Sequence, residues 1–175
     1  MAIEIERRFL MRDARAAASS SGIIDRCRIR QGSLGWVDGL RVRVRIITNR
    51  GVEQTALLTL KGRRQGICRE EYEHPLALDR AEQTLGTLPP TRIVCKTRYG
   101  LGHRGLVWSI DLFEGPNSGL VIAEVELTHP EQYVELPPWV GEEITSNPPR
   151  WRARRSEMMA ARWPGLRLPC RRHSD

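Results

Sequence analysis

Residues 40–46 read Leu-Arg-Val-Arg-Val-Arg-Ile, so apolar and charged side chains alternate with a period of two. This period is typical of a β-strand, in which successive side chains point to opposite faces. Arg41, Arg43 and Arg45 therefore share one face of the expected strand, and the aliphatic residues share the other. Three arginines at alternate positions repel one another on a bare surface, so the pattern indicates that an anion meets this face.

The same alternation recurs along the chain and predicts about eight strands. Turn signals such as Gly35 and Asn49-Arg50-Gly51 separate most of the segments. The expected strands lie at residues 3–10, 27–34, 40–48, 55–62, 68–76, 92–100, 106–113 and 120–127. Helical patterns are confined to residues 79–88 and 151–163, with a weaker one at 12–18. We therefore predict an α+β, mainly β fold: a closed eight-stranded antiparallel β-barrel, or tunnel, with a few flanking helices.

Charged residues occupy one face of nearly every predicted strand. Besides the three arginines, this face carries Glu4, Glu6, Arg8, Lys61, Arg69, Glu71, Glu73, Lys96, Arg98, Asp111, Glu124 and Glu126. Charged strand residues more commonly face solvent on a sandwich whose other face forms the core. The clustering of like charges favours the alternative, in which the sheet closes around them.

Rows of both signs inside one barrel match the chemistry of a metal–polyphosphate. Arginine offers a planar fork of donors to phosphate oxygens, and lysine offers a point charge. Pairs of carboxylates hold Mg²⁺ or Mn²⁺. Opposite charges across the lumen also limit the cost of burying them. Only Lys61 and Lys96 among the 28 basic residues are lysine, and both lie on the charged face, which suggests a need for a compact ammonium group there.

The net charge of +7 does not predict a nucleic-acid-binding protein, because the excess lies at the C-terminus. Residues 150–175 carry eight arginines against Glu157 and Asp175, which leaves 20 basic and 19 acidic residues before them. Such a tail is most often solvated. We expect one domain over residues 1–163 and a loosely held basic tail over 164–175.

Other features argue against a zinc protein and a membrane protein. The four cysteines and four histidines are scattered, with no pair at metal-ligand spacing. No apolar run approaches the roughly 18 residues of a membrane helix, and the acidic start, Ala2-Ile3-Glu4, is unlike a secretory signal. We expect a cytoplasmic location.

The charged segments, taken in order, resemble the CYTH family of triphosphate tunnel metalloenzymes. Glu4-Ile5-Glu6-Arg7-Arg8-Phe9-Leu10 is similar to the family's Glu-x-Glu-x-Lys signature, with arginine in the lysine position. The resemblance covers about residues 3–160. It continues through Arg30-Gln31-Gly32, Val42-Arg43-Val44-Arg45, Leu58-Thr59-Leu60-Lys61-Gly62, Arg69-Glu70-Glu71-Tyr72-Glu73, Lys96-Thr97-Arg98-Tyr99, Ile110-Asp111-Leu112-Phe113-Glu114-Gly115, Ala123-Glu124-Val125-Glu126-Leu127 and Pro138-Trp139-Val140-Gly141-Glu142-Glu143-Ile144-Thr145.

The resemblance implies a tunnel that hydrolyses or cyclises triphosphates with divalent metal. The family's metal-binding carboxylates match Glu4, Glu6, Glu124 and Glu126, with Asp111 and Glu73 as supporting candidates. Its phosphate-binding residues match Arg43, Arg45, Lys61, Lys96 and Arg98. Arg8 is expected to bind a terminal phosphate, and Arg8, Glu6 and Glu126 are the expected catalytic residues. The role of Arg41, an extra arginine on the same face, is open.

Two departures from the family pattern fall together. In small bacterial members that cleave tripolyphosphate, the signature lysine works with a tyrosine after the Arg-Gln-Gly turn; here these positions hold Arg8 and Ser33. Lysine can lose its proton when it is desolvated, whereas arginine effectively cannot. Arg8 is therefore a phosphate ligand rather than a base. Ser109 replaces a frequent acid, and Trp151-Arg152-Ala153 replaces the family's Tyr-x-Asn.

We predict metal-dependent hydrolysis of a linear triphosphate, with inorganic tripolyphosphate the first candidate and Mg²⁺ or Mn²⁺ the metal. Three alternatives stay open: cyclisation of ATP to cyclic AMP, as in class IV-type adenylate cyclases; hydrolysis of an organic triphosphate such as thiamine triphosphate; and non-catalytic binding of polyphosphate or nucleotides. The expected partner is a small triphosphate, with neither membrane nor nucleic acid. A homodimer is left open by the apolar outer rows.

Overall fold

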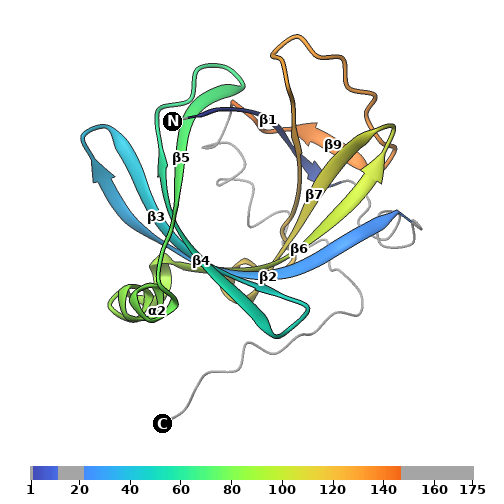
Figure 1. Ribbon diagram of the computed structural model, residues 1–175. Helices are drawn as coiled ribbons and strands as arrows, with labels where there is room; N and C mark the ends of the chain where they lie inside the picture. The colour runs from blue at the N-terminus through green and yellow to red at the C-terminus, as the bar shows by residue number, and fades with distance from the viewer. Residues whose placement is uncertain (1, 12–21, 147–175) are drawn as a thin grey trace.

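The barrel consists of eight antiparallel strands, and a ninth strand extends one of them. The structure is a computed structural model that describes residues 2–11 and 22–146. Its strands are β1 (Ala2–Met11), β2 (Ile23–Val37), β3 (Leu40–Asn49), β4 (Glu53–Lys61), β5 (Cys68–Pro75), β6 (Ile93–His103), β7 (Leu106–Phe113), β8 (Val121–Glu126) and β9 (Val140–Glu143). They run in the order β5-β4-β3-β2-β6-β7-β8-β1-β9, and pairing of β5 with β1 closes the ring (Figure 1). The predicted closed barrel is confirmed.

Strand β1 closes the barrel because it changes partner along its length. Its residues Ala2–Ile5 pair with β5, and Phe9 and Met11 pair with β9 on the same edge. On its other edge, Glu6–Leu10 pair with β8. Glu4 is therefore paired with β5, and Glu6 is paired with β8.

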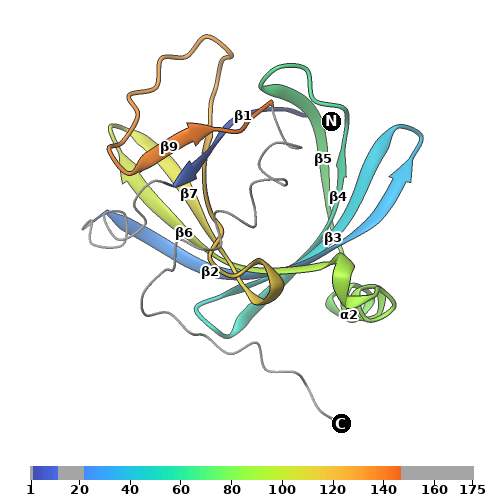
Figure 2. The same cartoon turned by 180° about the vertical axis from the view of Figure 1, so that it is seen from behind.

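The apolar core packs against the outside of the barrel. Phe9, Trp108 and Val125 are fully buried beneath Val134 and Trp139 of the segment that follows β8. On the other side, the α-helix α2 (Leu78–Gly86) places Ala81 and Leu85 against Val44 and Ile46 of β3. Figures 1 and 2 show α2 outside the ring of strands. Helix α2 and the segment before β9 thus cover parts of the outer face, and the charged residues lie on the opposite, inner face.

One end of the inner face is apolar. Leu10 and Ile122 are paired residues of β1 and β8, each two positions from Arg8 and Glu124 on the same face. They form a buried cluster with Leu120 and Ile144, against which Phe113 packs. Ile122 has no exposed surface. We call this cluster the apolar floor (Leu10, Phe113, Leu120, Ile122 and Ile144), and it borders the charged residues of the inner face on this side.

Two glycines lie inside β2. Gly35 was predicted to end a strand, and that prediction was wrong: the strand continues to Val37 through a register shift, with Gly35 at φ +120°. Gly32 lies within the strand predicted at residues 27–34, and the structure confirms that strand. A Cβ on Gly32 would lie 2.4 Å from Leu88 Cδ1 and 2.8 Å from Leu85 Cδ2, so this glycine allows close packing over β2.

The one helix predicted within the described residues is present. Helix α2 confirms the pattern at 79–88, and two single 3₁₀ turns, η1 (Pro90–Arg92) and η2 (Gly115–Asn117), follow. The patterns at 12–18 and 151–163 and the tail at 164–175 lie outside the described residues. Among residues 2–11 and 22–146, none of the helices has the length and apolar character that crossing a membrane requires.

Candidate active site

Cross-strand pairing places the predicted site residues on one face of the closed sheet. Residues directly opposite each other in an antiparallel pair lie on the same face. The pairs on this face include Glu6 with Glu126, Arg8 with Glu124, Glu4 with Arg69, Lys61 with Glu71 and with Arg41, Arg43 with Thr59, Thr59 with Glu73, and Arg98 with Asp111. Arg45 and Lys96 follow from the alternation along β3 and β6.

Arg43 is the buried cation without a carboxylate partner in this set. Its Nε atom is buried without a hydrogen-bond acceptor, and it forms no ion pair with another described residue. Burial, with the positive charges of Arg45 and Arg69 nearby, lowers the pKa of Arg43 to about 10. Arg45 has a similarly unbonded Nε, while its Nη2 lies 3.2 Å from Glu73 Oε1. An unpartnered buried guanidinium is costly unless an anion binds it.

Glu124 and Asp111 are held by basic residues from two strands, β1 and β6. Glu124 Oε1 accepts from Arg8 Nε at 2.9 Å, and its Oε2 accepts from Arg98 Nη2 at 2.6 Å. Asp111, which has no exposed surface, accepts two hydrogen bonds from Arg98 and one from Lys96. Burial alone would raise the pKa of Glu124, yet the charges of Arg8 and Arg98 hold it well below its usual value. The carboxylates of Asp111 and Glu124 in turn raise the pKa of Arg98, although burial opposes this.

Glu4, Glu6, Glu71 and Glu126 form an acidic cluster at the β1–β5 closure. Lys61 Nζ lies 3.1 Å from Glu4 Oε1 and 2.6 Å from Glu71 Oε2. Burial and a hydrogen bond with Glu4 raise the pKa of Glu71 to about 7. Burial would raise the pKa of Glu4 too, but hydrogen bonds from Arg69 and Glu71 and the charge of Lys61 lower it to about 2. Glu4 is thus the ionised member of this pair.

Glu126 is the carboxylate of this cluster that lacks a cation. It forms no ion pair or hydrogen bond with another described side chain. Burial and the charges of Glu4 and Glu6 raise the pKa of Glu126. A group of carboxylates with unsatisfied negative charge is suited to a hard divalent cation such as Mg²⁺ or Mn²⁺. The donor set therefore fits a divalent metal.

The described residues contain no group of three acids, histidines or cysteines already arranged around a common metal position. The reason is visible in the contacts of Glu4 and Glu6. Arg69 bonds to both carboxylates, and Arg64 bonds to Glu6. These guanidinium groups hold the carboxylates that the sequence predicted as metal ligands.

Three residues of the lumen were missed as site candidates. Arg69 and Glu71 lie on the charged face that the alternation predicted, but neither was assigned a role. Arg64 belongs to the loop between β4 and β5, where no periodicity indicates which way a side chain points. Its only sequence signal is the run Gly62-Arg63-Arg64-Gln65-Gly66, a turn-like composition with two cations.

The departures Arg8 and Ser33 occupy different surroundings. Arg8 is engaged with Glu124, as described above, and its backbone N–H donates to Thr145 Oγ1 at 2.9 Å. Ser33 is paired with Arg43 across β2 and β3. Ser33 thus lies beside the unpartnered arginine, where a small side chain leaves room.

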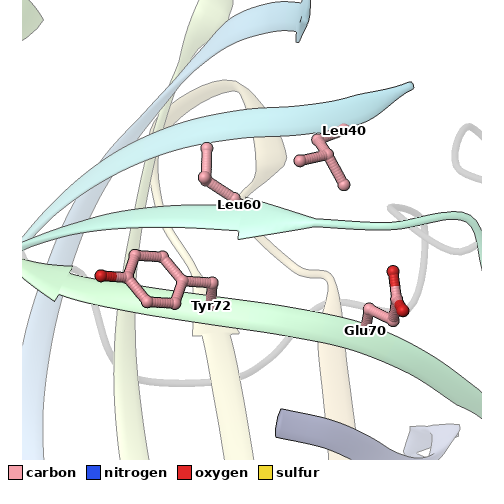
Figure 3. A pocket seen from close by; sticks show the side chains of 4 residues that line it. All are labelled: Leu40, Leu60, Glu70 and Tyr72. Carbon is pink, nitrogen blue, oxygen red and sulfur yellow. The ribbon is translucent and has the colours of Figure 1, made fainter. Parts of the chain in front are cut away.

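A hollow on the outer face is distinct from the lumen. Leu40, Leu60, Glu70 and Tyr72 line a space of about 260 Å³ over β3, β4 and β5 (Figure 3). Leu60 is paired with Tyr72 on the face opposite Lys61 and Glu71. Among its lining residues, Glu70 is the charged one and none is basic, so this hollow lacks the cations that binding a polyphosphate requires.

A closed antiparallel barrel with rows of arginine, lysine and carboxylate on its inner face is the architecture of a triphosphate tunnel. No family model matches the chain. It is 34% identical over 148 residues to an inorganic triphosphatase of Acetivibrio thermocellus, covering 85% of this chain and 89% of the relative. It is also 34% identical to an inorganic triphosphatase of Nitrosomonas europaea, covering 82% and 90%.

A solved structure gives the same result. The crystal structure of the inorganic triphosphatase NE1496 superposes with a TM-score of 0.57 at 29% identity, covering 94% of this chain and 99% of that one. The chain belongs to the family of these proteins, the CYTH family of triphosphate tunnel metalloenzymes.

Proposed function

We propose that this protein is an enzyme that hydrolyses a linear triphosphate inside the barrel, with inorganic tripolyphosphate as the first substrate to test. The observation that carries the proposal is Arg43, a buried guanidinium with no carboxylate partner among the described residues. The two relatives reported above, from Acetivibrio thermocellus and Nitrosomonas europaea, are inorganic triphosphatases. A polyphosphate supplies the missing negative charge, and a folded protein that retains such a cation gains from binding an anion there.

The basic residues of the lumen would bind the phosphates. Arg43 and Arg45 of β3 and Arg98 of β6 offer planar donor groups, while Lys61 and Lys96 offer point charges. Arg8 of β1 would bind a terminal phosphate, and its guanidinium offers a planar set of donors like those of the other arginines. Catalysis would come from positioning and from stabilising the charge that develops on the transferred phosphoryl group.

The carboxylates would hold Mg²⁺ or Mn²⁺. The proposed ligands are Glu4, Glu6, Glu124 and Glu126, with Asp111 and Glu73 in support. A divalent ion bound there supplies charge neutralisation and a water of lowered pKa. Glu6 and Glu126 face each other across β1 and β8, so they, together with Arg8, are the proposed catalytic residues. Glu73 accepts a hydrogen bond from Thr59 Oγ1 at 3.0 Å and forms an ion pair with Arg45.

Other parts of the assignment rest on sequence alone. A cytoplasmic location, a possible homodimer and the division between residues 163 and 164 stay predictions, as does the choice between Mg²⁺ and Mn²⁺. Size-exclusion chromatography with light scattering measures the oligomeric state, and truncation after residue 163 tests whether the tail is needed for folding.

A substrate panel tests the proposed function. The full-length protein is incubated with tripolyphosphate, ATP or thiamine triphosphate, each with Mg²⁺, Mn²⁺ or EDTA. The proposal expects metal-dependent phosphate release, fastest from tripolyphosphate. Cyclic AMP from ATP would identify a cyclase instead, preferential cleavage of thiamine triphosphate an organic triphosphatase, and metal-dependent binding without turnover a binding protein.

A further inference from the structure

Arg64 holds Glu6 from outside the strands. Its Nη2 donates to Glu6 Oε1, and its Nη1 donates to the backbone oxygens of Ile67 (3.0 Å) and Glu6 (3.4 Å). The guanidinium therefore ties the β4–β5 loop to the middle of β1. Both partners of this ion pair are largely buried, with 17% of the Arg64 side chain and 5% of the Glu6 side chain exposed.

Glu6 Oε1 is bonded by two guanidinium groups at once. Arg69 Nη2 donates to the same oxygen at 2.8 Å, and Arg69 also bonds to Glu4. The two arginines repel each other: burial and the charge of Arg69 lower the pKa of Arg64. A divalent ion cannot approach Glu6 Oε1 while two cations share it, because like charges at hydrogen-bond distance in a buried site repel strongly.

Of the two arginines, Arg64 is the one whose position allows it to release Glu6. Arg69 lies on β5, directly opposite Glu4, and keeps a second carboxylate if it loses Glu6. Arg64 lies in a loop, and among residues 2–11 and 22–146 its ion-pair partner is Glu6 alone. The loop itself stays anchored without Arg64, through Gly62 N–H to Glu70 O (2.9 Å) and Glu6 N–H to Ile67 O (3.1 Å).

We propose that Arg64 is a resident cation of the metal site: it neutralises Glu6 in the metal-free protein and is displaced when a divalent ion binds. Arg64 is then a positioning residue that sets metal affinity, although it does not itself touch the metal. The inference rests on the proposed assignment of Glu6 as a metal ligand. Its consequence is that metal binding competes with an ion pair inside the protein, and removing the competitor strengthens metal binding.

Binding of Mn²⁺ alone to the full-length protein tests the proposal. We expect Arg64→Gln to bind Mn²⁺ about tenfold more tightly than the unchanged protein, by isothermal titration calorimetry without substrate, since a hydrogen-bonded ion pair of this kind no longer competes. Arg63→Gln is the matched control. It removes the same charge from the same loop, and Arg63 is exposed and has no ion pair with another described residue. Its Mn²⁺ affinity is expected to equal that of the unchanged protein.

Unchanged or weaker Mn²⁺ binding by Arg64→Gln would overturn the proposal. A second measurement needs no variant: hydrogen exchange of the unchanged protein, in which Mn²⁺ is expected to increase deuterium uptake in residues 63–67 as Arg64 releases its carbonyl contacts. No change or slower exchange there would contradict displacement. If the unchanged protein binds no Mn²⁺ at all, the proposed metal ligands fail; if it binds Mn²⁺ but neither result appears, this inference alone fails.

Discussion

The buried charge of Arg43 destabilises the folded protein, although it favours binding of an anionic substrate. Its buried charge lacks a carboxylate, and its pKa of about 10 lies below the usual 12.5. The charged form of Arg43 is therefore less stable in the folded protein than in water, by about 3 kcal/mol at most. Proteins commonly retain such costs where function requires them.

Replacing Arg43 by methionine is therefore expected to stabilise the protein and to weaken substrate binding. The free energy of unfolding should rise by about 1–3 kcal/mol, measured by urea denaturation, while the KM for tripolyphosphate rises at least about tenfold. Arg50→Met, in the exposed β3–β4 turn, should leave both quantities nearly unchanged. A destabilised Arg43→Met protein with normal KM would show that Arg43 is structural.

Glu71 gives the metal-free protein a pH dependence of known sign. Its pKa of about 7 exceeds the unfolded value of 4.5, so the folded state binds this proton more tightly. The stability it contributes is present below about pH 4.5 and is lost as pH rises through 7, by about 3 kcal/mol at most. Glu4, with a pKa of about 2, contributes stability above pH 4.5 that is lost as pH falls through 2.

Glu71→Gln is expected to remove the loss of stability between pH 5 and 8, because glutamine resembles the protonated carboxyl group. Urea denaturation in EDTA at several pH values measures this, with the stability of the variant rising relative to the unchanged protein as pH increases. Parallel stability profiles for the two proteins would mean that Glu71 does not titrate in this range.

The residues of the inner face could be predicted because alternation alone assigns a face to each strand residue. Lys61, Arg98 and Glu124 were therefore placed together without coordinates. The partner of each charge could not be predicted, since it depends on register between strands far apart in sequence. Arg64 lies in the loop between β4 and β5, where no periodic sequence pattern indicates the direction of a side chain.

At the scale of the elements, the packing of α2 over the barrel depends on Gly32. A side chain there would meet Leu88 and Leu85 within 2.8 Å, and the outer surface of β2 would have to move away from them. The glycine at position 32 thus serves the packing of α2 against β2.

Gly32→Ala is expected to destabilise the protein by about 1–3 kcal/mol, the usual cost of overpacking a core. Gly86→Ala is the matched control, since a Cβ on Gly86 meets nothing within 4 Å. It should be neutral or slightly stabilising. Equal unfolding midpoints for the two variants in urea would refute the packing role of Gly32.

Eight strands could be predicted because each has a long alternating segment bounded by turn residues. Strand β9 was missed, because Val-Gly-Glu-Glu is four residues long and does not alternate. Its pairing arises only because β1 extends beyond β5 and leaves an edge to be filled. The β2 bulge was missed for a related reason: a glycine in a strand and a glycine in a turn look the same in sequence.

At the scale of the molecule, the arrangement inverts that of an ordinary small barrel. The apolar core lies outside, beneath α2 and the segment before β9, and the charges lie inside. Inside, the apolar floor lies next to Arg8 and Glu124 on the inner face. We infer that a substrate enters from the charged side and presents a free terminal phosphate toward this apolar end.

We accordingly expect a triphosphate that is esterified at both ends to be excluded. Diadenosine triphosphate should be neither hydrolysed nor an effective competitor, whereas tripolyphosphate is hydrolysed; phosphate release and inhibition assays measure the two effects. Cleavage of diadenosine triphosphate at a rate similar to that of tripolyphosphate would show that the lumen is open at both sides.

The most direct test of the inward-facing charges is phosphate release from tripolyphosphate by Glu126→Gln, compared with the unchanged protein and with Glu131→Gln, an exposed loop acid. The unchanged protein and Glu131→Gln are expected to be equally active with Mg²⁺ or Mn²⁺ and inactive in EDTA. Glu126→Gln is expected to lose activity by about a hundredfold or more, because it removes one of the proposed metal ligands. Undiminished hydrolysis by Glu126→Gln, or hydrolysis that persists in EDTA, would contradict the account.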